Sequence, residues 1–255
     1  MSREENEKRV KQEFDKLVAL FDKNTEFLNE NYTDCFKIFK HIYLINHFKN
    51  RAETKRFFNT NFDIAFSLML ESIYALYSGH IRAALLLLRS AQEMTLKSII
   101  YQERNWIKTK KENVSFEDLS FRFLENKTIF IKDITPYLNK TIYADYFSKL
   151  DKTVTIYKEL SGIVHSSNKS IDFNLYQYFS SIIYKKSDIN KFLNLFMTTL
   201  RNLLDLICYM MRDSLKLWDT YELKDLLSII IKKEKSRINY INRIRGNENN
   251  SQKYL

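Results

Sequence analysis

An all-α fold, a multi-helix bundle, is predicted by three features of this 255-residue chain. It contains three glycines and one proline, where average usage would give about 18 and 13. Sheets joined by tight turns need both residues, whereas long helices need neither, because both weaken helix interiors. The apolar content of 45% is sufficient for a well-buried core. Apolar residues also recur at helical spacing, which an AT-rich genome alone would not produce.

The first half of the chain is expected to form four helices. An amphipathic pattern predicts a helix over residues 3–24, and a second helical segment follows over about 33–48. Residues 61–77 and 80–104 are predicted to be two helices that meet at Gly79, because glycine can adopt the left-handed conformation that closes a helix. The second of these is apolar on nearly all sides at its start, so we expect it to be the central helix of the bundle.

The second half is predicted to begin with a polar, lysine-rich loop over 106–115. Short helices are expected near 116–125 and 137–150, with Pro136 at a helix start, and another helix over 151–165. The longest helix is predicted over about 188–218 and the last over about 221–245, which brings the total to about seven to nine helices. We divide the chain into a bundle, residues 1–231, and a basic C-terminal helix with a frayed tail, residues 232–255.

Several classes of protein are not expected from this sequence. Cys35 and Cys208 lie far apart in apolar helical stretches, which favours buried thiols over a disulfide framework or a zinc site. The charged N-terminus argues against a signal peptide, and no apolar run approaches the ~20 residues that cross a bilayer. We therefore expect a cytoplasmic protein with no membrane segment, no metal and no cofactor.

The net charge of +10 favours polyanionic partners such as RNA, DNA or acidic proteins. Much of the excess lies near the C-terminus, where six cationic residues accompany a single acidic one, Glu234. One interpretation is a nucleic-acid-binding arm, whose cations meet phosphates while Tyr240 stacks on a base. The other is a solvated lysine-rich helix whose apolar side packs on the bundle. The six cations are Lys232, Lys233, Lys235, Arg237, Arg243 and Arg245.

Three charged residues fall on one face of the predicted central helix. Arg82, Arg89 and Glu93 have the spacing i, i+7 and i+11, which keeps them within roughly 40 degrees of arc. Arg89 and Glu93, one turn apart, are expected to pair. Charges in so apolar a helix are costly unless they are satisfied. They are either a structural ion pair that fixes helix register or part of a ligand-binding or catalytic site.

A second polar set follows the later helix. Tyr157, Ser161 and His165 have the spacing i, i+4 and i+8, so their side chains project along one side. A histidine near neutral pKa can act as a general acid or base, and an adjacent hydroxyl can orient it. The alternative is a partly buried histidine bonded to a backbone carbonyl or to Glu93.

The run YSGHIRAALLLLRSAQEM, followed about 65 residues later by YKELSGIVHSS, resembles the paired signature of a set of bacterial helical proteins. In those proteins, a helix with an Arg-x-x-x-Glu pair packs against a later helix with Tyr-x-x-Leu-Ser-x-x-x-His. They are similar to the HEPN group (higher eukaryotic and prokaryotic nucleotide-binding domains). Many members are metal-independent RNases or abortive-infection effectors that dimerise to form their site. The match covers residues 71–167 and implies a HEPN-like core.

The sequence departs from the catalytic HEPN pattern, in which four to six residues separate an arginine from the histidine that follows it. Positions 158–160 hold lysine, glutamate and leucine instead, and lysine lacks the planar fork that clamps phosphate. Arg82 or Arg89 would have to supply the cation from the neighbouring helix, with His165 as the base.

The leading hypothesis is a prokaryotic HEPN-like protein of host defence or stress response, a homodimer that binds or cleaves RNA. The alternative is a non-enzymatic adaptor, of abortive-infection or phage origin, that recognises a protein partner. A DNA-binding accessory protein is a third possibility, for which we find no recognition-helix signature.

Overall fold

The computed structural model describes the backbone of residues 3–20, 26–111, 113–165 and 186–246. These ranges contain eleven α-helices, one short 3-10 helix and no strand, which confirms the all-α prediction. The helices are α1 (Arg3–Leu20), α2 (Glu26–Glu30), α3 (Tyr32–Asn50), η1 (Lys55–Phe57), α4 (Thr60–Tyr77), α5 (Ile81–Lys110), α6 (Phe123–Ile134), α7 (Ala144–His165), α9 (Lys186–Met210), α10 (Arg212–Leu215), α11 (Thr220–Leu227) and α12 (Glu234–Arg245).

The α4–α5 hairpin forms where the sequence predicts it. The Asn59 side chain caps α4 by accepting a hydrogen bond from the backbone N–H of Phe62. Gly79 closes α4 with a φ of +78°, the left-handed conformation expected of this glycine. The prediction of a loop from residue 106 is wrong, because α5 continues to Lys110. Its last turns bury Ile107 and carry the half-buried Trp106, so tertiary packing outweighs the local lysine content.

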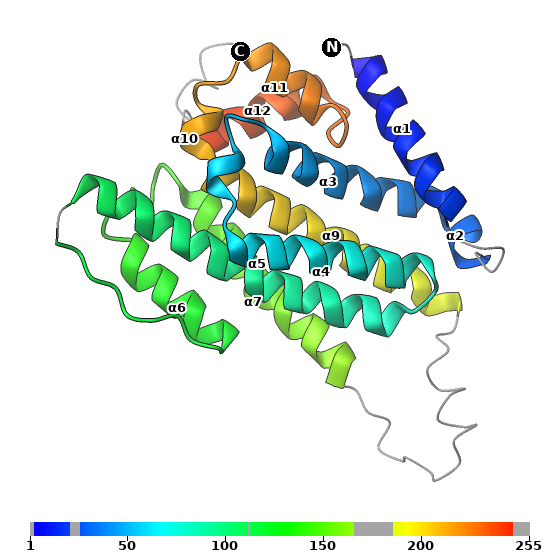
Figure 1. Cartoon of the computed structure of the whole chain (residues 1–255), viewed down its shortest axis with the longest axis horizontal. Coiled ribbons are helices and arrows are strands. Elements are labelled where there is room, and N and C mark those ends of the chain that lie inside the picture. The colour runs from blue at the N-terminus through cyan, green and yellow to red at the C-terminus, as the bar shows by residue number, and fades with distance from the viewer. Residues whose placement is uncertain (1–2, 21–25, 112, 166–185, 247–255) are drawn as a thin grey trace, which may run out of the picture.

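Two helices occupy the middle of the bundle (Figure 1). The helix α5 contacts α4, α6, α7 and α9, and α9 contacts α3, α5 and α7. Both helices bury side chains on several faces, among them Leu88 and Ile99 of α5 and Phe196 and Leu203 of α9. The central position predicted for α5 is confirmed, and α9 shares it.

Four predictions about the helices of the second half are wrong. The helix α7 runs unbroken through the segment predicted as two helices, and Pro136 follows the end of α6 instead of starting a helix. The predicted long helix stops at Met210, and the predicted last helix is divided into α11 and α12. A new helix, α11, starts after Asp219, because the Asp219 side chain accepts hydrogen bonds from the backbone N–H groups of Tyr221 and Glu222.

An ion pair inside the core joins α5 to α10. The guanidinium of Arg212 contacts both carboxylate oxygens of Glu103, at 2.5 and 2.8 Å, and both side chains are almost completely buried. The Tyr146 hydroxyl of α7 donates a third hydrogen bond to the same carboxylate at 3.0 Å. Paired and hydrogen-bonded in this way, the two charges tolerate burial.

Cys35 and Cys208 are buried free thiols, as predicted. Burial raises the pKa of both to about 12, which leaves them unreactive at neutral pH. Among the described helices, none is at once long and apolar enough to cross a membrane.

Candidate functional site

The helices α5 and α7 pack against each other in opposite directions. Glu103 contacts Tyr146 near one end of the pair, and the Gln92 amide donates to the carbonyl of residue 153 further along. Residues nearer the N-terminus of α5 therefore lie beside residues nearer the C-terminus of α7. This register brings the two polar faces predicted from the sequence against each other.

Four of the predicted site residues form one hydrogen-bond network. Arg89 Nε donates to Ser161 Oγ at 2.8 Å, and Arg89 Nη2 donates to the Tyr157 hydroxyl. That hydroxyl in turn donates to Glu93 Oε1 at 2.7 Å. Arg89 Nη2 and Glu93 Oε1 lie 3.3 Å apart, which confirms the predicted ion pair. We call these four residues the α5–α7 network.

The α5–α7 network lies between core and solvent. The side chains of Arg89 and Glu93 are 20% and 26% exposed. The Tyr157 ring stacks on Phe123 of α6, with ring centroids 4.0 Å apart, and the Arg89 guanidinium lies 4.5 Å from the centroid of the Tyr157 ring. Partial burial and the bond to Glu93 raise the pKa of Tyr157, so its hydroxyl stays protonated at neutral pH.

The network restricts what Arg89 can do chemically. Its charge is compensated by Glu93, and its Nε and Nη2 atoms already have acceptors. A phosphate would have to compete with these groups. Arg89 therefore fixes the spacing of α5 and α7 and is less suited to clamp a ligand.

The remaining predicted site residues lie at the same end of the helix pair. His165 is the last residue of α7, and its side chain lies outside the described part of the chain. Arg82 lies in α5 two turns before Arg89 and is partly exposed. The antiparallel register places Arg82 about level with position 165, which makes Arg82 the α5 cation nearest to the end of α7. Lys158, at one of the positions where the HEPN pattern has arginine, is exposed.

The basic C-terminal helix packs on the body of the molecule through α10 and α11. It buries Tyr240, Ile241 and Ile244, and the Tyr240 hydroxyl donates to Asp205 of α9 at 2.9 Å. Tyr240 is thus part of the core. The prediction that it could stack on a base is wrong for this arrangement.

The three arginines of this helix contact the protein itself. Arg237 is buried and donates to the carbonyls of Ile231 and Lys232. Arg243 lies 3.3 Å from Asp145 of α7. Arg245 donates to the carbonyls of residues 215 and 218 and to the hydroxyl of residue 220. These contacts join α12 to α7, α10 and α11, so the arginines have a structural role that the charge pattern did not distinguish.

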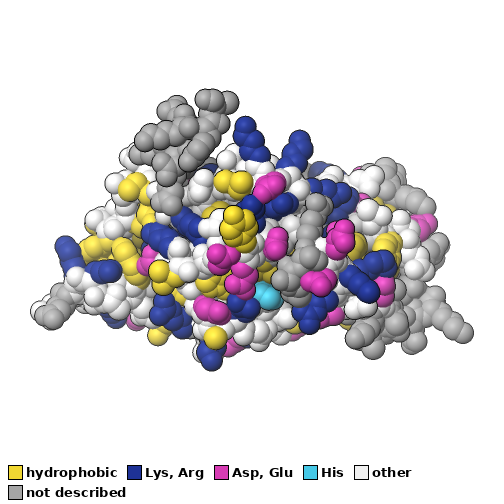
Figure 2. All heavy atoms as spheres, turned by 90° about the horizontal axis from the view of Figure 1, so that it is seen from above, with side chains coloured by type: hydrophobic (Ala, Val, Ile, Leu, Met, Phe, Trp, Pro, Cys, Tyr) yellow, Lys and Arg dark blue, Asp and Glu magenta, His cyan; other side chains and the backbone are white. Residues whose placement is uncertain are grey.

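The lysines before and within the first turn of α12 differ from these arginines in their exposure to solvent. Lys232, Lys233 and Lys235 are all exposed at the surface. Figure 2 views the side of the molecule that carries α1 and α11, and on this face Lys and Arg side chains are interspersed with Asp and Glu. The positive charge on that face does not form one continuous patch. A polyanion contact by this helix therefore depends on the three lysines.

The structure also contains a cleft that the sequence did not predict. It has a volume of about 450 Å³ and lies between the segment after α3 and the segment that joins α10 to α11. Its lining includes Glu53, Arg56, Leu217, Trp218, Asp219 and Glu222.

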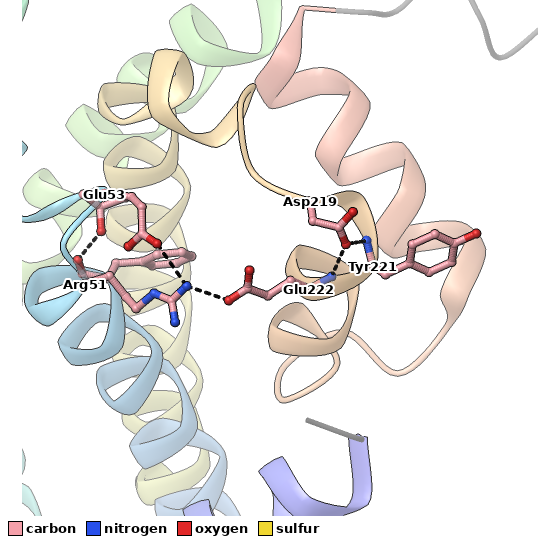
Figure 3. Close-up of polar contacts among 7 residues, drawn as sticks. Arg51, Glu53, Asp219, Tyr221 and Glu222 are labelled. Atoms are coloured by element: carbon pink, nitrogen blue, oxygen red, sulfur yellow. Dashed lines mark hydrogen bonds and ion pairs between the residues drawn. The ribbon is translucent and has the colours of Figure 1, made fainter.

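Charged side chains form one wall of this cleft. Figure 3 shows Arg51 between two carboxylates: Arg51 Nη2 lies 3.3 Å from Glu53 Oε1 and 2.6 Å from Glu222 Oε1. The Arg51 guanidinium also lies over the Trp218 ring, 5.1 Å from its centroid.

One part of this region could be predicted from the sequence. Asp219 and Glu222 have the spacing of a helix-capping pair and predict a new helix start at residue 220.

No group of histidine, cysteine, aspartate and glutamate side chains in the described ranges has the geometry to hold a metal ion. No family model, curated protein or solved structure matches the chain. The resemblance to HEPN proteins therefore depends on the two sequence motifs alone.

Proposed function

We propose that this chain is a HEPN-like helical protein of prokaryotic host defence or stress response, and that it binds or cleaves RNA at the α5–α7 surface. One observation carries the proposal: the two halves of the motif, 64 to 72 residues apart, meet in a single partly exposed network. Arg89 and Glu93 come from the first half, and Tyr157 and Ser161 come from the second.

In the catalytic form of this proposal, the reaction is a metal-independent transesterification. A base removes the proton of a 2′-hydroxyl, and the resulting oxygen attacks the adjacent phosphorus. The bond to the 5′-oxygen breaks, that oxygen takes up a proton, and a 2′,3′-cyclic phosphate remains. His165 is the proposed base, and a cation is needed to stabilise the negative charge on the phosphate oxygens.

Arg82 is the better candidate for this cation. Arg82 is level with position 165 in the helix register, whereas Arg89 lies two turns further along α5. Arg89, Tyr157 and Ser161 then act as positioning residues that hold the end of α7 against α5.

The test is cleavage of a mixed RNA pool in EDTA by the wild type and by His165→Ala. His47→Gln is the matched control, because His47 is a partly exposed histidine of α3, outside the α5–α7 pair. We expect 2′,3′-cyclic phosphate products from the wild type and the control, and loss of cleavage in a folded His165→Ala protein. Full activity of that variant would exclude His165 as the base.

A non-enzymatic adaptor is the second candidate, favoured by the internal hydrogen bonds of Arg89. A network that satisfies its own charges can serve as a structural support without any ligand. Absence of RNA cleavage and of RNA binding by the wild type would favour this function.

A homodimer is also part of the proposal. Light scattering is expected to give twice the chain mass of 30.7 kDa. A mass equal to one chain at assay concentrations would remove the dimer from the account.

A further inference from the structure

The helices α4 and α5 carry an apolar outer face. The described ranges contain eleven large apolar side chains that are exposed, and five of them lie on these two helices, so apolar exposure is concentrated here. Figure 1 shows α4 and α5 on the near side of the molecule, in front of α7 and α9. We call the five residues the α4–α5 face: Ile64, Leu70 and Tyr74 of α4, and Leu86 and Tyr101 of α5.

The apolar area of the α4–α5 face is that of a homodimer interface. The exposed fractions run from 43% for Leu86 to 66% for Tyr74, so the five side chains together expose on the order of 500 Å². A standard interface buries about 800 Å² of each partner, and about 65% of a homodimer interface is apolar. The face therefore supplies the apolar area that one side of a stable dimer needs.

Two hydrogen bonds fix the register between α4 and α5. The Asn59 side-chain amide, next to the start of α4, donates to the carbonyl of residue 98 at 3.3 Å. The Ser72 hydroxyl, near the end of α4, donates to the carbonyl of residue 84 at 2.8 Å. The two helices are therefore antiparallel, and residues nearer the C-terminus of α4 lie level with residues nearer the N-terminus of α5.

Two charges of opposite sign lie on this outer face at different levels. Glu71 of α4 is exposed, accepts a hydrogen bond from the Ser67 hydroxyl, and is about level with Leu86 in the register of the hairpin. Lys97 lies on the same side of α5 as Leu86, three turns or about 16 Å further along the helix. It is partly exposed and has no acidic partner among the residues that the structure describes.

We propose that the α4–α5 face binds the same face of a second copy of this chain, with the two α5 helices antiparallel and the two-fold axis near Ser90 and Met94. The proposal rests on the homodimer of the proposed function and assigns its interface. This axis exchanges the level of Leu86 with the level of Lys97. Each Glu71 then meets Lys97 of the second copy, so two ion pairs form at equal distances from the axis.

The same axis pairs the aromatic residues of the face. Tyr74 is about level with position 83 of α5, so the axis places Tyr74 opposite Tyr101 of the second copy. Ser90, close to the axis, is small and lets the two α5 helices approach each other. A face that compensates its own charges and pairs its own aromatic side chains fits a second copy better than it fits an unrelated protein.

The experiment measures the mass of the full chain by sedimentation equilibrium over a dilution series. Leu86→Asp places an unpaired charge in the interface twice, because the symmetry repeats it, and should weaken dimerisation at least about 100-fold. Leu124→Asp is the matched control, because Leu124 is a leucine of α6 with a similar exposed fraction, 47%. Circular dichroism checks that both variants are folded. We expect the wild type and the control to be dimers.

Charge reversal tests the orientation of the two copies. Glu71→Lys and Lys97→Glu each place like charges opposite each other, and each should weaken dimerisation at least about tenfold. The double variant Glu71→Lys/Lys97→Glu restores opposite charges at both contacts and should dimerise nearly as well as the wild type.

Three results would overturn the proposal. A wild type that stays monomeric at the highest concentration reached would remove the dimer together with its interface. A dimer that Leu86→Asp leaves intact would exclude this face while the homodimer of the proposed function stands. A double charge variant as weak as the single variants would exclude the antiparallel arrangement. None of these results depends on whether the chain binds or cleaves RNA.

Discussion

The hydroxyl of Tyr157 on α7 donates a hydrogen bond of 2.7 Å to Glu93 on α5. It also accepts from Arg89, so one phenol connects both charges of α5 to the neighbouring helix. This arrangement explains why an otherwise apolar helix carries an arginine and a glutamate one turn apart. Each charge has a partner on its own helix and a second one across the interface.

Glu93→Ala should lower the free energy of unfolding by about 1–2 kcal/mol, because Tyr157 and Arg89 lose their shared acceptor. The value is at the low end for a buried polar group, since Glu93 is 26% exposed and water replaces part of the interaction. Urea denaturation measures it. Tyr157→Phe, which keeps the stack on Phe123 and removes only the hydroxyl, should have a smaller effect in the same direction. A denaturation curve unchanged by Glu93→Ala would show that the network does not stabilise the fold.

The core ion pair predicts a larger effect. Arg212→Met leaves the Glu103 carboxylate buried without its cation, which should cost about 3–5 kcal/mol. The double variant Glu103→Leu/Arg212→Met should recover much of this stability, because it removes both charges. A double variant as unstable as the single one would mean that shape, and not charge, is the property that matters here.

Folding stability should depend on pH through His41. Burial lowers the pKa of His41 to about 4, and its neutral ring keeps an Nδ1 hydrogen bond with the backbone of Lys37. Unfolded histidine has a pKa of about 6.5, so at pH values between these two the unfolded chain binds a proton that the folded chain does not. The contribution of neutral His41 to the free energy of unfolding, up to about 3 kcal/mol, is complete above about pH 6.5 and is lost as the pH falls towards 4.

The measurement is the free energy of unfolding at several pH values between about 4 and 7, the window that these two pKa values define. His41→Gln should reduce the slope of the free energy of unfolding against pH. His80→Ala, a change at an exposed histidine, should leave this slope unchanged. Equal slopes for wild type and His41→Gln would contradict the buried, neutral state of His41.

If the C-terminal helix binds RNA, its surface lysines are responsible. Replacing Lys232, Lys233 and Lys235 together with glutamine should weaken RNA binding and flatten the dependence of log affinity on log salt, by about one unit of slope for each phosphate that is no longer neutralised. Stability should change little. Removing the whole segment after residue 231 is a poorer test, because it also removes the buried Tyr240 and Ile244. An unchanged salt slope in the triple variant would exclude this helix from RNA binding.

Local patterns were sufficient to predict the helices and the pairing within α5. Scarce glycine, a single proline and apolar periodicity predict an all-α fold, and the left-handed Gly79 predicts the α4–α5 hairpin. The spacing of Arg89 and Glu93 predicts their ion pair. It does not predict that Tyr157 lies against them, because that arrangement depends on the register between α5 and α7.

Features that depend on distant segments could not be predicted. The extension of α5 past Trp106 is stabilised by tertiary packing, including the Arg212 guanidinium, which lies 5.3 Å from the Trp106 ring centroid. The cleft joins residues 52–56 to residues 214–222, and the Ser214 hydroxyl donates to the carbonyl of Glu53 across 161 positions of sequence. The structural role of Arg237 and Arg245 in α12 could not be predicted from the number of charges either, because the carbonyl groups that accept their hydrogen bonds lie outside α12.

We propose that RNA binds at the end of the α5–α7 pair, where Arg82 is level with position 165. The most direct test of this claim is the affinity for an uncleavable 2′-O-methyl RNA of the wild type, of Arg82→Gln and of Lys152→Gln, which removes an exposed charge elsewhere on α7. We predict that Arg82→Gln weakens binding about tenfold, as expected when one arginine no longer holds a phosphate, and that Lys152→Gln binds like the wild type. Equal affinity of Arg82→Gln and the wild type, in proteins with the same thermal stability, would contradict the claim.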